Sequence, residues 1–596
     1  MRKIYKALII GSGAAAYSSA DWLYREGVRD IAIVTEGRLS GTSRNTGSDK
    51  QTYYKISMDG FTPDSPYKMA SDMFAGGSCD GEKMYIEAVN SQRCFLRLCE
   101  YGVNFPTDKF GGYPGYKTDH DDTVRATSVG PLTSKRMTEK LERVVLEKNK
   151  TPIFDNKLVI KILTLNGKTY GVRVLDTATN KTENIFAENV ICATGAPACI
   201  YEDSVYPKSQ HGMTGVLVEA GVRMCNFTQW QYGMASVDFR WNVSGSFMQV
   251  IPRFVSIDKE GNEYEFLSDY FEDINVAYSY VFLKGYQWPF SFNRAEESSR
   301  IDLAVHSEMS KGRKVYLDYR KNPADFSFEK LCNEARQYIN LTECMADTPF
   351  ERLKKLNSKA IDVYLRQGIN LETEALRIAV CAQHNNGGVY TDINFETDIK
   401  GLYVIGEAAG TFGLSRPGGS ALNDTQVGGL IAAKHIKAKN AEPVDENKLS
   451  AFEIKQKAFT VNSTVDYSRF KKKMSQSAAF KRDYESCLSL LKEVSEALAA
   501  YPDEHRSLLE YYRDRDMLLS MKALLEAIVS ELPETGSRGG AVFIKNGEAV
   551  KENLHFRDYL TVTSDGKTEY IRVSPVPYGQ KPFEHYLSRI NEGETT

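Results

Sequence analysis

The sequence contains no cluster of cysteines that could hold a metal centre. Its ten cysteines are scattered over 596 residues, and no two of them form a C-x-x-C pair. Structural zinc sites and iron–sulfur clusters usually show such spacing. The sequence therefore predicts no metal site in this chain. The scattered cysteines also fit a reducing compartment, which indicates a cytoplasmic protein.

Long hydrophobic runs and an excess of one charge are missing as well. No stretch approaches about 18 uninterrupted apolar residues, the length that predicts a membrane-spanning helix. The chain starts Met1-Arg2-Lys3-Ile4-Tyr5, and we expect neither a signal peptide nor a twin-arginine leader. The formal net charge is −3, so nucleic acid is not an expected partner. The length predicts two to four globular domains.

The strongest pattern lies in the first forty residues. The apolar run Lys6–Ile10 leads into the turn Gly11-Ser12-Gly13-Ala14-Ala15-Ala16. A helical pattern then continues to Leu23, and a second apolar run, Ile31–Val34, is followed by Glu36. A strand, a tight turn, a helix and a second strand closing on an acid form a dinucleotide-binding unit in its usual order.

Each part of this unit has a physical role. Gly11 permits the sharp turn, and Gly13 lets the backbone approach a pyrophosphate. The helix start offers unpaired N–H groups and a partial positive charge to the phosphates. Glu36 lies slightly further along than the usual spacing of about 20 residues and could accept from ribose hydroxyls. A glycine-rich turn alone can be a plain loop, but here strand, helix and acid agree.

Two later stretches extend the predicted site. The polar loop Arg38–Asp49 is too long for a simple turn, and its Gly, Ser and Thr content predicts ligand contacts, the alternative being a solvated connector. The strand pattern Asn189–Cys192 ends in Ala193-Thr194-Gly195, which is typical of the second turn in many dinucleotide sites. Between them we expect helices over 65–100 and 134–148 and a β-meander over 158–187.

The most specific stretch runs from His384-Asn-Asn-Gly-Gly388 through Gly401-Leu-Tyr-Val-Ile-Gly-Glu407 to Gly413–Leu422. With the N-terminal turn, Ala193-Thr194-Gly195 and residues 212–231, it resembles the fumarate reductase/succinate dehydrogenase flavoprotein family, which includes L-aspartate oxidase. The resemblance implies an α/β fold, a Rossmann-like FAD-binding domain interrupted by an α+β capping domain and followed by a C-terminal helical region. The implied boundaries are 1–231 and 376–440 for the FAD-binding domain, 232–375 for the capping domain and 441–596 for the C-terminal part.

The resemblance also implies FAD as the cofactor. The residues expected to contact it are Gly11, Gly13, Ala14, Ala15, Glu36, Gly37, Ser43, Arg44, Asn45, Thr46, Gly47, Ala193, Thr194, Gly195, Gly406, Glu407, Gly418, Gly419, Ser420, Ala421 and Leu422. Glu407 would hold ribityl or ribose hydroxyls, and the helix start at 418–422 would stabilise negative charge on the flavin's pyrimidine end. Respiratory members carry a flavin-bonded histidine where this chain has Asn45, so the FAD should be non-covalent.

Arg416 and His384 are the predicted substrate contacts near the flavin. The resemblance implies that the Arg416 guanidinium clamps a substrate carboxylate in bidentate fashion, the alternative being a structural ion pair. His384 would hydrogen-bond substrate or flavin. However, only two residues separate it from Gly387-Gly388, where three are usual, and a histidine at a strand end is often a satisfied core residue.

Arg300 is the predicted proton donor, from the start of an amphipathic helix in the capping domain. Because the pKa of arginine exceeds about 12, such a donor needs a carboxylate relay, for which Asp302 and Glu297 are candidates. The alternative is a surface arginine on a solvated face. Arg253 is a weaker candidate, because the family's glycine-rich run after its arginine is missing here.

Two departures from the family predict the substrate. Its dicarboxylate-binding histidines are replaced by Pro131 and Gln231. An unpaired second carboxylate would cost several kcal/mol to bury, so fumarate and succinate should be poor substrates, and a monocarboxylate with a larger tail is preferred. The alternative is a replacement clamp from Arg253, Arg294 or Lys135. The aromatic residues between 270 and 292 fit either core packing or a wide apolar pocket.

The sequence therefore predicts an FAD-dependent reductase of the C=C bond of an α,β-unsaturated carboxylate. Two alternatives stay open: a flavin oxidase or dehydrogenase of an amino acid or saturated acid, and the flavin subunit of a multi-subunit electron-transfer reductase. The expected partners are a small-molecule carboxylate and a separate electron donor, which would be an NAD(P)H reductase, a reduced flavin or an iron–sulfur protein.

Overall fold

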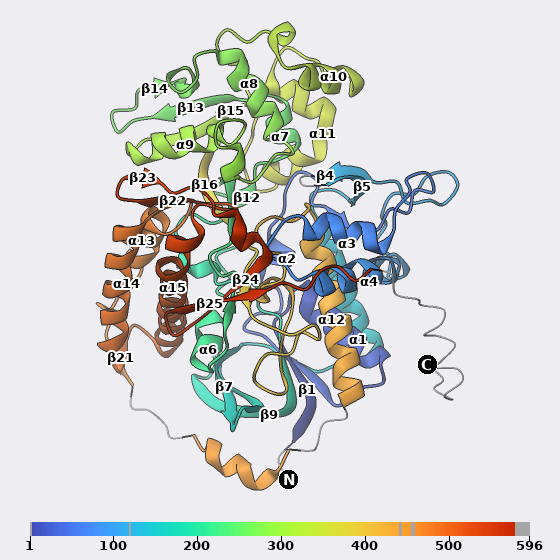
Figure 1. Ribbon diagram of the computed structural model, residues 1–596, viewed down its shortest axis with the longest axis vertical. Helices are drawn as coiled ribbons and strands as arrows, with labels where there is room; N and C mark the ends of the chain where they lie inside the picture. The colour runs from blue at the N-terminus through green and yellow to red at the C-terminus, as the bar shows by residue number, and fades with distance from the viewer. Residues whose placement is uncertain (1–2, 119–120, 440–443, 455–458, 579–596) are drawn as a thin grey trace.

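A computed structural model of the chain describes residues 3–118, 121–439, 444–454 and 459–578. Figure 1 shows three regions: the elements around β1 and α12, a region of strands and helices above them, and a helical C-terminal region beside them. The expected boundary after residue 440 falls at 440–443, outside the described residues.

A seven-stranded sheet forms the centre of the lower region. Its order is β6-β2-β1-β9-β8-β7, with β18 also paired to β9. The bounds are β1 (Ile4–Ile10), β2 (Ile31–Val34), β6 (Ile153–Phe154), β7 (Lys157–Leu165), β8 (Lys168–Asp176), β9 (Lys181–Cys192) and β18 (Leu402–Val404). β2, β1, β9 and β18 run parallel, with Ile10 opposite both Val34 and Cys192. Four strands thus end at one edge, where ligand sites of such sheets form.

Helices α1 (Ala14–Arg25) and α12 (Ser420–Lys439) cover one face of this sheet side by side (Figure 1). Small residues allow the close packing: a Cβ on Gly429 would lie 2.9 Å from the backbone nitrogen of Ser19. The predicted β-meander is confirmed as β7, β8 and β9. Its first turn is Asn166-Gly167, where both residues have positive φ, as tight hairpin turns require.

Two neighbouring strands connect the upper region to the lower one. β11 (Trp230–Ser236) and β16 (Leu376–Asn385) pair antiparallel and continue into a six-stranded sheet with β13 (Arg253–Ile257) and β15 (Lys314–Asp318). Helices α8 (Ile274–Leu283), α9 (Arg300–Ser310), α10 (Asn333–Leu341) and α11 (Pro349–Leu365) accompany it. The chain therefore enters and leaves this region along neighbouring strands.

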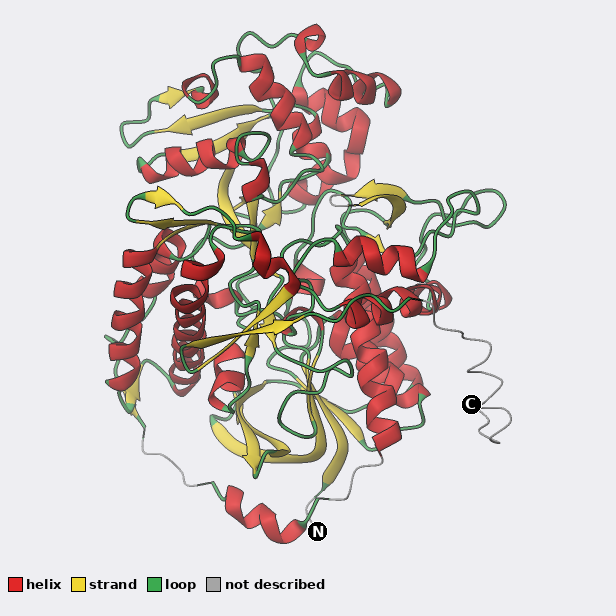
Figure 2. Cartoon of the chain, viewed as in Figure 1, coloured by secondary structure: helices red, strands yellow, loops and turns green. Residues whose placement is uncertain are grey.

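The C-terminal region is mainly helical, as Figure 2 shows. Its helices are α13 (Arg469–Ser477), α14 (Tyr484–Ala499) and α15 (Leu508–Thr535). It also contributes strands: the hairpin β24 (Tyr559–Ser564) and β25 (Lys567–Arg572) pairs through β24 with β10 (Met224–Cys225). The hairpin joins the C-terminal region to the lower region by backbone hydrogen bonds.

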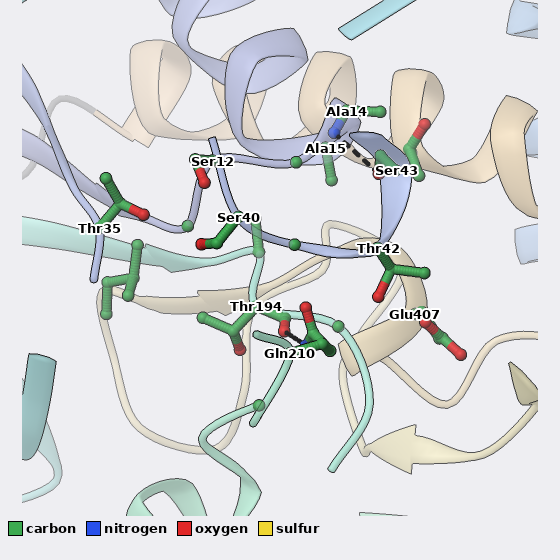
Figure 3. Close-up of a pocket in the computed structure, with 18 of the residues that line it drawn as sticks. Ser12, Ala14, Ala15, Thr35, Ser40, Thr42, Ser43, Thr194, Gln210 and Glu407 are labelled. Atoms are coloured by element: carbon green, nitrogen blue, oxygen red, sulfur yellow. Dashed lines mark hydrogen bonds between the residues drawn. The ribbon is translucent and has the colours of Figure 1, made fainter. Parts of the chain in front are cut away.

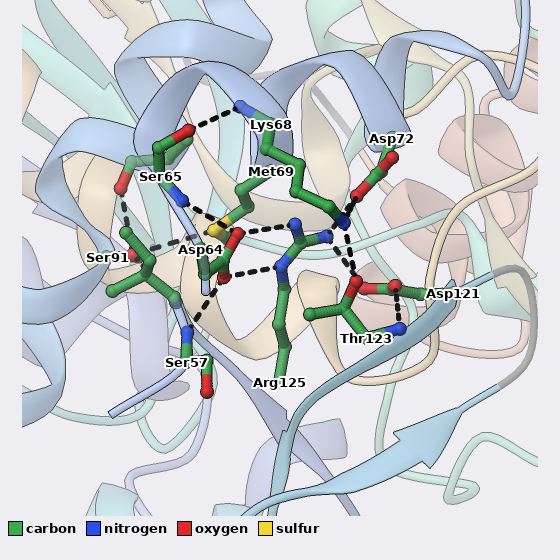
Figure 4. A network of polar contacts seen from close by, with 12 residues as sticks. Ser57, Asp64, Ser65, Lys68, Met69, Asp72, Ser91, Asp121, Thr123 and Arg125 are labelled. Atoms are coloured by element: carbon green, nitrogen blue, oxygen red, sulfur yellow. Dashed lines mark hydrogen bonds and ion pairs between the residues drawn. The ribbon is translucent and has the colours of Figure 1, made fainter. Parts of the chain in front are cut away.

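A small three-stranded sheet beside helix α3 (Pro66–Phe74) contains a buried arginine, Arg125, in its strand β5 (Asp121–Thr127) (Figure 4). The Arg125 guanidinium is fully buried and contacts Asp64, Asp72 and Asp121 at 2.7, 2.8 and 2.9 Å. Arg125 also donates to the Tyr54 hydroxyl at 2.9 Å. Several partners surround the guanidinium, as a charge removed from water requires.

Candidate active site

A cavity opens at the edge where the parallel strands end. It encloses about 1200 Å³ of empty space, counting its open mouth. The predicted FAD contacts that line it are Gly11, Gly13, Ala14, Ala15, Glu36, Ser43, Thr46, Ala193, Thr194, Gly195, Glu407, Ala421 and Leu422. The predicted contacts that are not among its described lining residues are Gly37, Arg44, Asn45, Gly47, Gly406, Gly418, Gly419 and Ser420. His384 lines the cavity, whereas Arg416 and Arg300 do not.

The first turn approaches the second so closely that Gly11 admits no side chain. A Cβ there would lie 2.5 Å from the Ala193 carbonyl oxygen, and the φ of Gly11 is +120°. Gly13 is the N-cap of α1 and offers no side-chain acceptor to the helix start. The Ala14 N–H instead donates to Ser43 Oγ at 3.2 Å. The turn therefore brings a helix start with its partial positive charge to the cavity wall.

Unpartnered polar groups on the wall show that the cavity is built for a polar ligand. The hydroxyls of Thr42 and Thr194 are buried and have no hydrogen-bond partner among the described residues. Gln210 lies beside them and donates through its side-chain amide to the Thr194 carbonyl at 2.6 Å (Figure 3). Buried hydroxyls without partners are costly, so a ligand with its own donors and acceptors would satisfy them. These features fit FAD.

Glu407 provides the carboxylate on the opposite wall. It accepts hydrogen bonds from the Tyr206 hydroxyl and, at 3.0 Å, from the Asn385 N–H. Burial raises the pKa of Glu407, and the donated hydrogen bond from Tyr206 opposes the rise. Glu407 also lines the cavity.

Arg416 is connected to the cavity wall through Asn386, a residue that the sequence did not single out. Its Nη2 donates to Gln231 Oε1 at 2.9 Å, and its Nε donates to Asn386 Oδ1 at 3.2 Å. The same Asn386 oxygen lies 3.2 Å from His384 Nδ1. Burial, together with the Arg416 charge, holds the pKa of His384 well below its usual value, so the imidazole is neutral. Arg416, Gln231, Asn386 and His384 form one polar cluster.

The charged residues of the upper region have other partners. The Arg300 guanidinium lies over the Phe271 ring, 4.9 Å from its centroid. Asp302, the expected relay, is fully buried and pairs with Lys284 Nζ at 2.8 Å. Arg253 contacts Glu263, Glu265 and, at 3.2 Å, Asp318.

Among the helices of the described residues, none has the length and apolar character to cross a membrane. Within the same residues, no group of three or more His, Cys, Asp or Glu side chains could hold a metal ion.

Comparison with known proteins identifies the family. A family described as "FAD binding domain" matches residues 6–422 of the chain. The chain belongs to this family. FAD as the cofactor and FAD-dependent oxidoreductase as the class are thereby confirmed, together with the resemblance to the fumarate reductase/succinate dehydrogenase flavoproteins.

The similar proteins agree with the family. An uncharacterized FAD-dependent oxidoreductase of Methanocaldococcus jannaschii is 25% identical over 457 residues, which are 75% of this chain and 74% of that protein. An L-aspartate oxidase of Synechocystis is 23% identical over 68% of this chain and 66% of its own length. The structure of an E. coli quinol fumarate reductase FrdA mutant covers 98% of both chains with a TM-score of 0.70 at 17% identity, a similarity of fold.

The loop after Glu36 reaches the FAD cavity mainly through residues that the sequence did not specify. Ser40, Gly41 and Thr42 line it together with Ser43 and Thr46. Arg44 is buried away from the cavity and pairs with Glu142 at 2.8 Å. The Asn45 amide donates to the carbonyls of Leu39 and Gly41, both at 3.0 Å, so it holds the loop in shape. The Gly, Ser and Thr content of the loop was the signal that could have found Ser40 and Thr42.

The C-terminal region contacts a residue of the cavity wall. Glu36 lines the cavity and forms an ion pair with Arg513 of helix α15. Arg513 and His211 line a small hollow that shares Leu158, Val159 and Met213 with the FAD cavity. Neither contact has a local signal in the sequence, because the partners lie hundreds of residues apart.

Proposed function

We propose that this FAD-dependent oxidoreductase reduces the C=C bond of an α,β-unsaturated monocarboxylate. The observation that carries the proposal is the placement of Arg416, which is joined through Asn386 to His384 on the wall of the FAD cavity. FAD, when bound, supplies two-electron hydride chemistry. A guanidinium next to that cavity can bind a carboxylate and draw electron density from the conjugated alkene.

Several residues of this chain would hold the cofactor. The α1 start at Gly13 and Ala14 would face the diphosphate, Thr42 and Thr194 would bond to it through their unpartnered hydroxyls, and Glu407 would accept from its hydroxyls. Asn45 stands where the respiratory members carry the flavin-bonded histidine, and its side chain is occupied within the loop. The FAD should therefore be non-covalent. Acid precipitation is expected to leave all the FAD in the supernatant, and a yellow pellet would contradict this.

The substrate should carry one carboxylate rather than two. Gln231 directs its carbonyl oxygen to Arg416, and Pro131 has no side-chain donor. A second carboxylate would lack the imidazole partners that the resemblance associates with these positions. The proposed proton donor is Arg300, and this role requires the start of α9 to approach the cavity from its present position over Phe271. A separate electron donor is proposed, since the fold resembles a protein named as quinol fumarate reductase.

Substitution of Arg416 tests the proposal. Protein reduced with dye under anaerobic conditions would be mixed with a panel of enoates, and flavin reoxidation followed. Arg416→Ala should slow the best substrate by about 100- to 1000-fold, the usual cost of losing a group that stabilises developing charge. Arg366→Ala, which removes an exposed arginine, serves as the control and should match the unsubstituted protein.

Full activity of Arg416→Ala on the best enoate would refute the clamp. Fumarate reoxidising the flavin faster than every monocarboxylate would refute the predicted substrate class instead.

A second candidate is oxidation of an amino acid or saturated acid, with electrons passed to O₂ or a quinone. The unpartnered Nε2 of His384 on the cavity wall favours it, because this nitrogen can hydrogen-bond to the amino or carboxyl group of such a substrate. The relative named L-aspartate oxidase also supports it. Rapid hydrogen peroxide formation on mixing reduced protein with O₂ would support this candidate, whereas slow reoxidation would favour the reductase.

A further inference from the structure

Asn386 joins the two functional side chains of the proposed site through one oxygen. Its side chain is almost completely buried, with 1% of its surface exposed. Its Oδ1 accepts from Arg416 Nε and lies at the same 3.2 Å distance from His384 Nδ1. On the other side of the amide, Nδ2 donates to the Leu414 carbonyl at 3.4 Å.

These contacts leave only one orientation for the Asn386 amide. A guanidinium nitrogen can only donate a hydrogen bond, so the atom facing Arg416 must be the amide oxygen. A backbone carbonyl can only accept, so the atom facing Leu414 must be the amide nitrogen. A flipped amide would place two donors together on one side and two acceptors together on the other.

The orientation of Asn386 then fixes the proton on His384. Because the partner of Nδ1 is an acceptor, Nδ1 must carry the ring proton. In the neutral ring, Nε2 therefore presents a lone pair. This nitrogen is buried and has no hydrogen-bond partner among the described residues, and His384 lines the FAD cavity. The nearest carboxylate oxygen, Glu407 Oε1, is 3.8 Å away and already accepts from Tyr206 and Asn385.

We propose that Asn386 is a positioning residue that holds His384 in the Nδ1–H form, so that Nε2 faces the cavity as a hydrogen-bond acceptor. The same oxygen orients the Arg416 guanidinium. The site then offers a donor at Arg416 for a carboxylate and an acceptor at His384 for an N–H or O–H group of the cofactor or substrate. His384 in this form does not donate to a carboxylate. The inference rests on the proposed function only for its location at the reacting end of the cavity.

Nitrogen NMR of the histidine rings tests the proposal without any turnover. FAD-loaded protein labelled with ¹⁵N at its imidazoles gives two ring resonances for His384, identified as those lost in His384→Gln. We expect one resonance typical of a protonated Nδ1 and one typical of an unprotonated Nε2, and neither chemical shift should change between about pH 6 and 8. A protonated Nε2 at neutral pH, in either the other neutral form or the imidazolium, would overturn the proposal.

Two substitutions separate positioning from plain structural support. Asn386→Leu removes the acceptor, so the His384 proton should move partly or fully to Nε2. Asn386→Asp keeps the shape of the side chain and adds a negative charge. The pKa of His384 should therefore rise, and the ring should become doubly protonated. If Asn386→Leu fails to fold, Asn386→Asp and the unsubstituted protein still decide the matter.

Asn423→Leu is the matched control. It also removes a buried amide, whose partners are Tyr53 and Glu87, and it contacts neither His384 nor Arg416 in the described structure. Its His384 resonances should equal those of the unsubstituted protein. Unchanged His384 resonances in both Asn386 variants would show that Asn386 does not position the ring. Since no substrate is used, a failed enoate assay would leave this result unaffected.

Discussion

Two buried carboxyl groups meet beside Arg416, on helices α4 (Gly81–Glu100) and α12. Glu87 and Asp424 line one small hollow with the arginine, and among the described residues Glu87 Oε1 and Asp424 Oδ2 have no hydrogen-bond partner besides the neighbouring carboxyl. Burial and the neighbouring Asp424 raise the pKa of Glu87 well above its usual range. Burial raises the pKa of Asp424 to about 6. The pair therefore holds a shared proton at neutral pH.

This pair should make the protein less stable as the pH rises. In the folded protein these carboxyl groups keep protons that the unfolded chain releases above about pH 4. Their contribution to stability is therefore complete below that pH, and it is lost as the pH rises through the pKa values of the folded protein. Glu87→Gln keeps a neutral donor toward Asp424. At pH 8 it should raise the free energy of unfolding by about 1–3 kcal/mol, and the gain should shrink toward pH 5.

Thermal unfolding at several pH values measures this effect. Glu82→Gln, on the exposed face of the same helix, is the control and should show no such pH-dependent gain. A Glu87→Gln protein that is less stable than the original at pH 8 would show that the carboxyls do not share a proton.

At the residue scale, the close approach of the two glycine-containing turns could be predicted from the sequence. Gly11 and Ala193-Thr194-Gly195 were found because a tight turn after a strand leaves a local pattern, and the structure shows the two turns in contact. Asn386 and Glu87 could not be found in this way. Asn386 lies within the stretch that carried the resemblance, but its contact with Arg416, like that of Glu87 with Asp424, joins separate segments and leaves no local pattern.

At the scale of elements, hydrophobic periodicity predicted well where one element decides its own structure. The helix expected over 134–148 is α5 (Thr133–Arg143) followed by a wider turn over Val144–Lys148. In the expected C-terminal helical region, α15 begins at Leu508, directly after the Ser507 cap. Boundaries moved because capping side chains, rather than apolar spacing, decide where a helix begins.

Elements that depend on distant partners were less predictable. The small sheet around Arg125 is held by acids from three separate segments, Asp64, Asp72 and Asp121 (Figure 4). The start of α9 at Arg300 was predicted, but the stacking of its guanidinium on Phe271 and the pairing of Asp302 with Lys284 were not. Hydrophobic periodicity indicates which face of a helix is buried, but it does not indicate which distant residue will contact a charged side chain of that helix.

At the scale of the whole molecule, the C-terminal region packs against the part of the chain that matches the FAD-binding family. Its β24 strand pairs with β10, and Asp516 of α15 accepts from the Val216 N–H at 2.8 Å at the start of helix α6 (Thr214–Glu219). Arg513 of the same helix pairs with Glu36 at the cavity edge. Binding of FAD should therefore respond to substitutions far from the dinucleotide motif in sequence.

Arg513→Met is the sharpest case of this long-range dependence. The substitution leaves the Glu36 carboxylate without its partner beside a cavity suited to a diphosphate, so the two like charges would repel. A repulsion of about 1 kcal/mol corresponds to a roughly fivefold weaker affinity for FAD. Titration of the apoprotein with FAD, followed by flavin fluorescence, measures this affinity, and added salt should reduce the difference.

Arg515→Met is the control. It removes an arginine from the same helix, where Arg515 pairs with Glu219 at 2.7 Å rather than with Glu36, and this variant should bind FAD normally. The double substitution Glu36→Gln with Arg513→Met removes both charges and should recover most of the lost affinity. Equal affinity in the two arginine variants would mean that the C-terminal helix supports the cavity by packing alone.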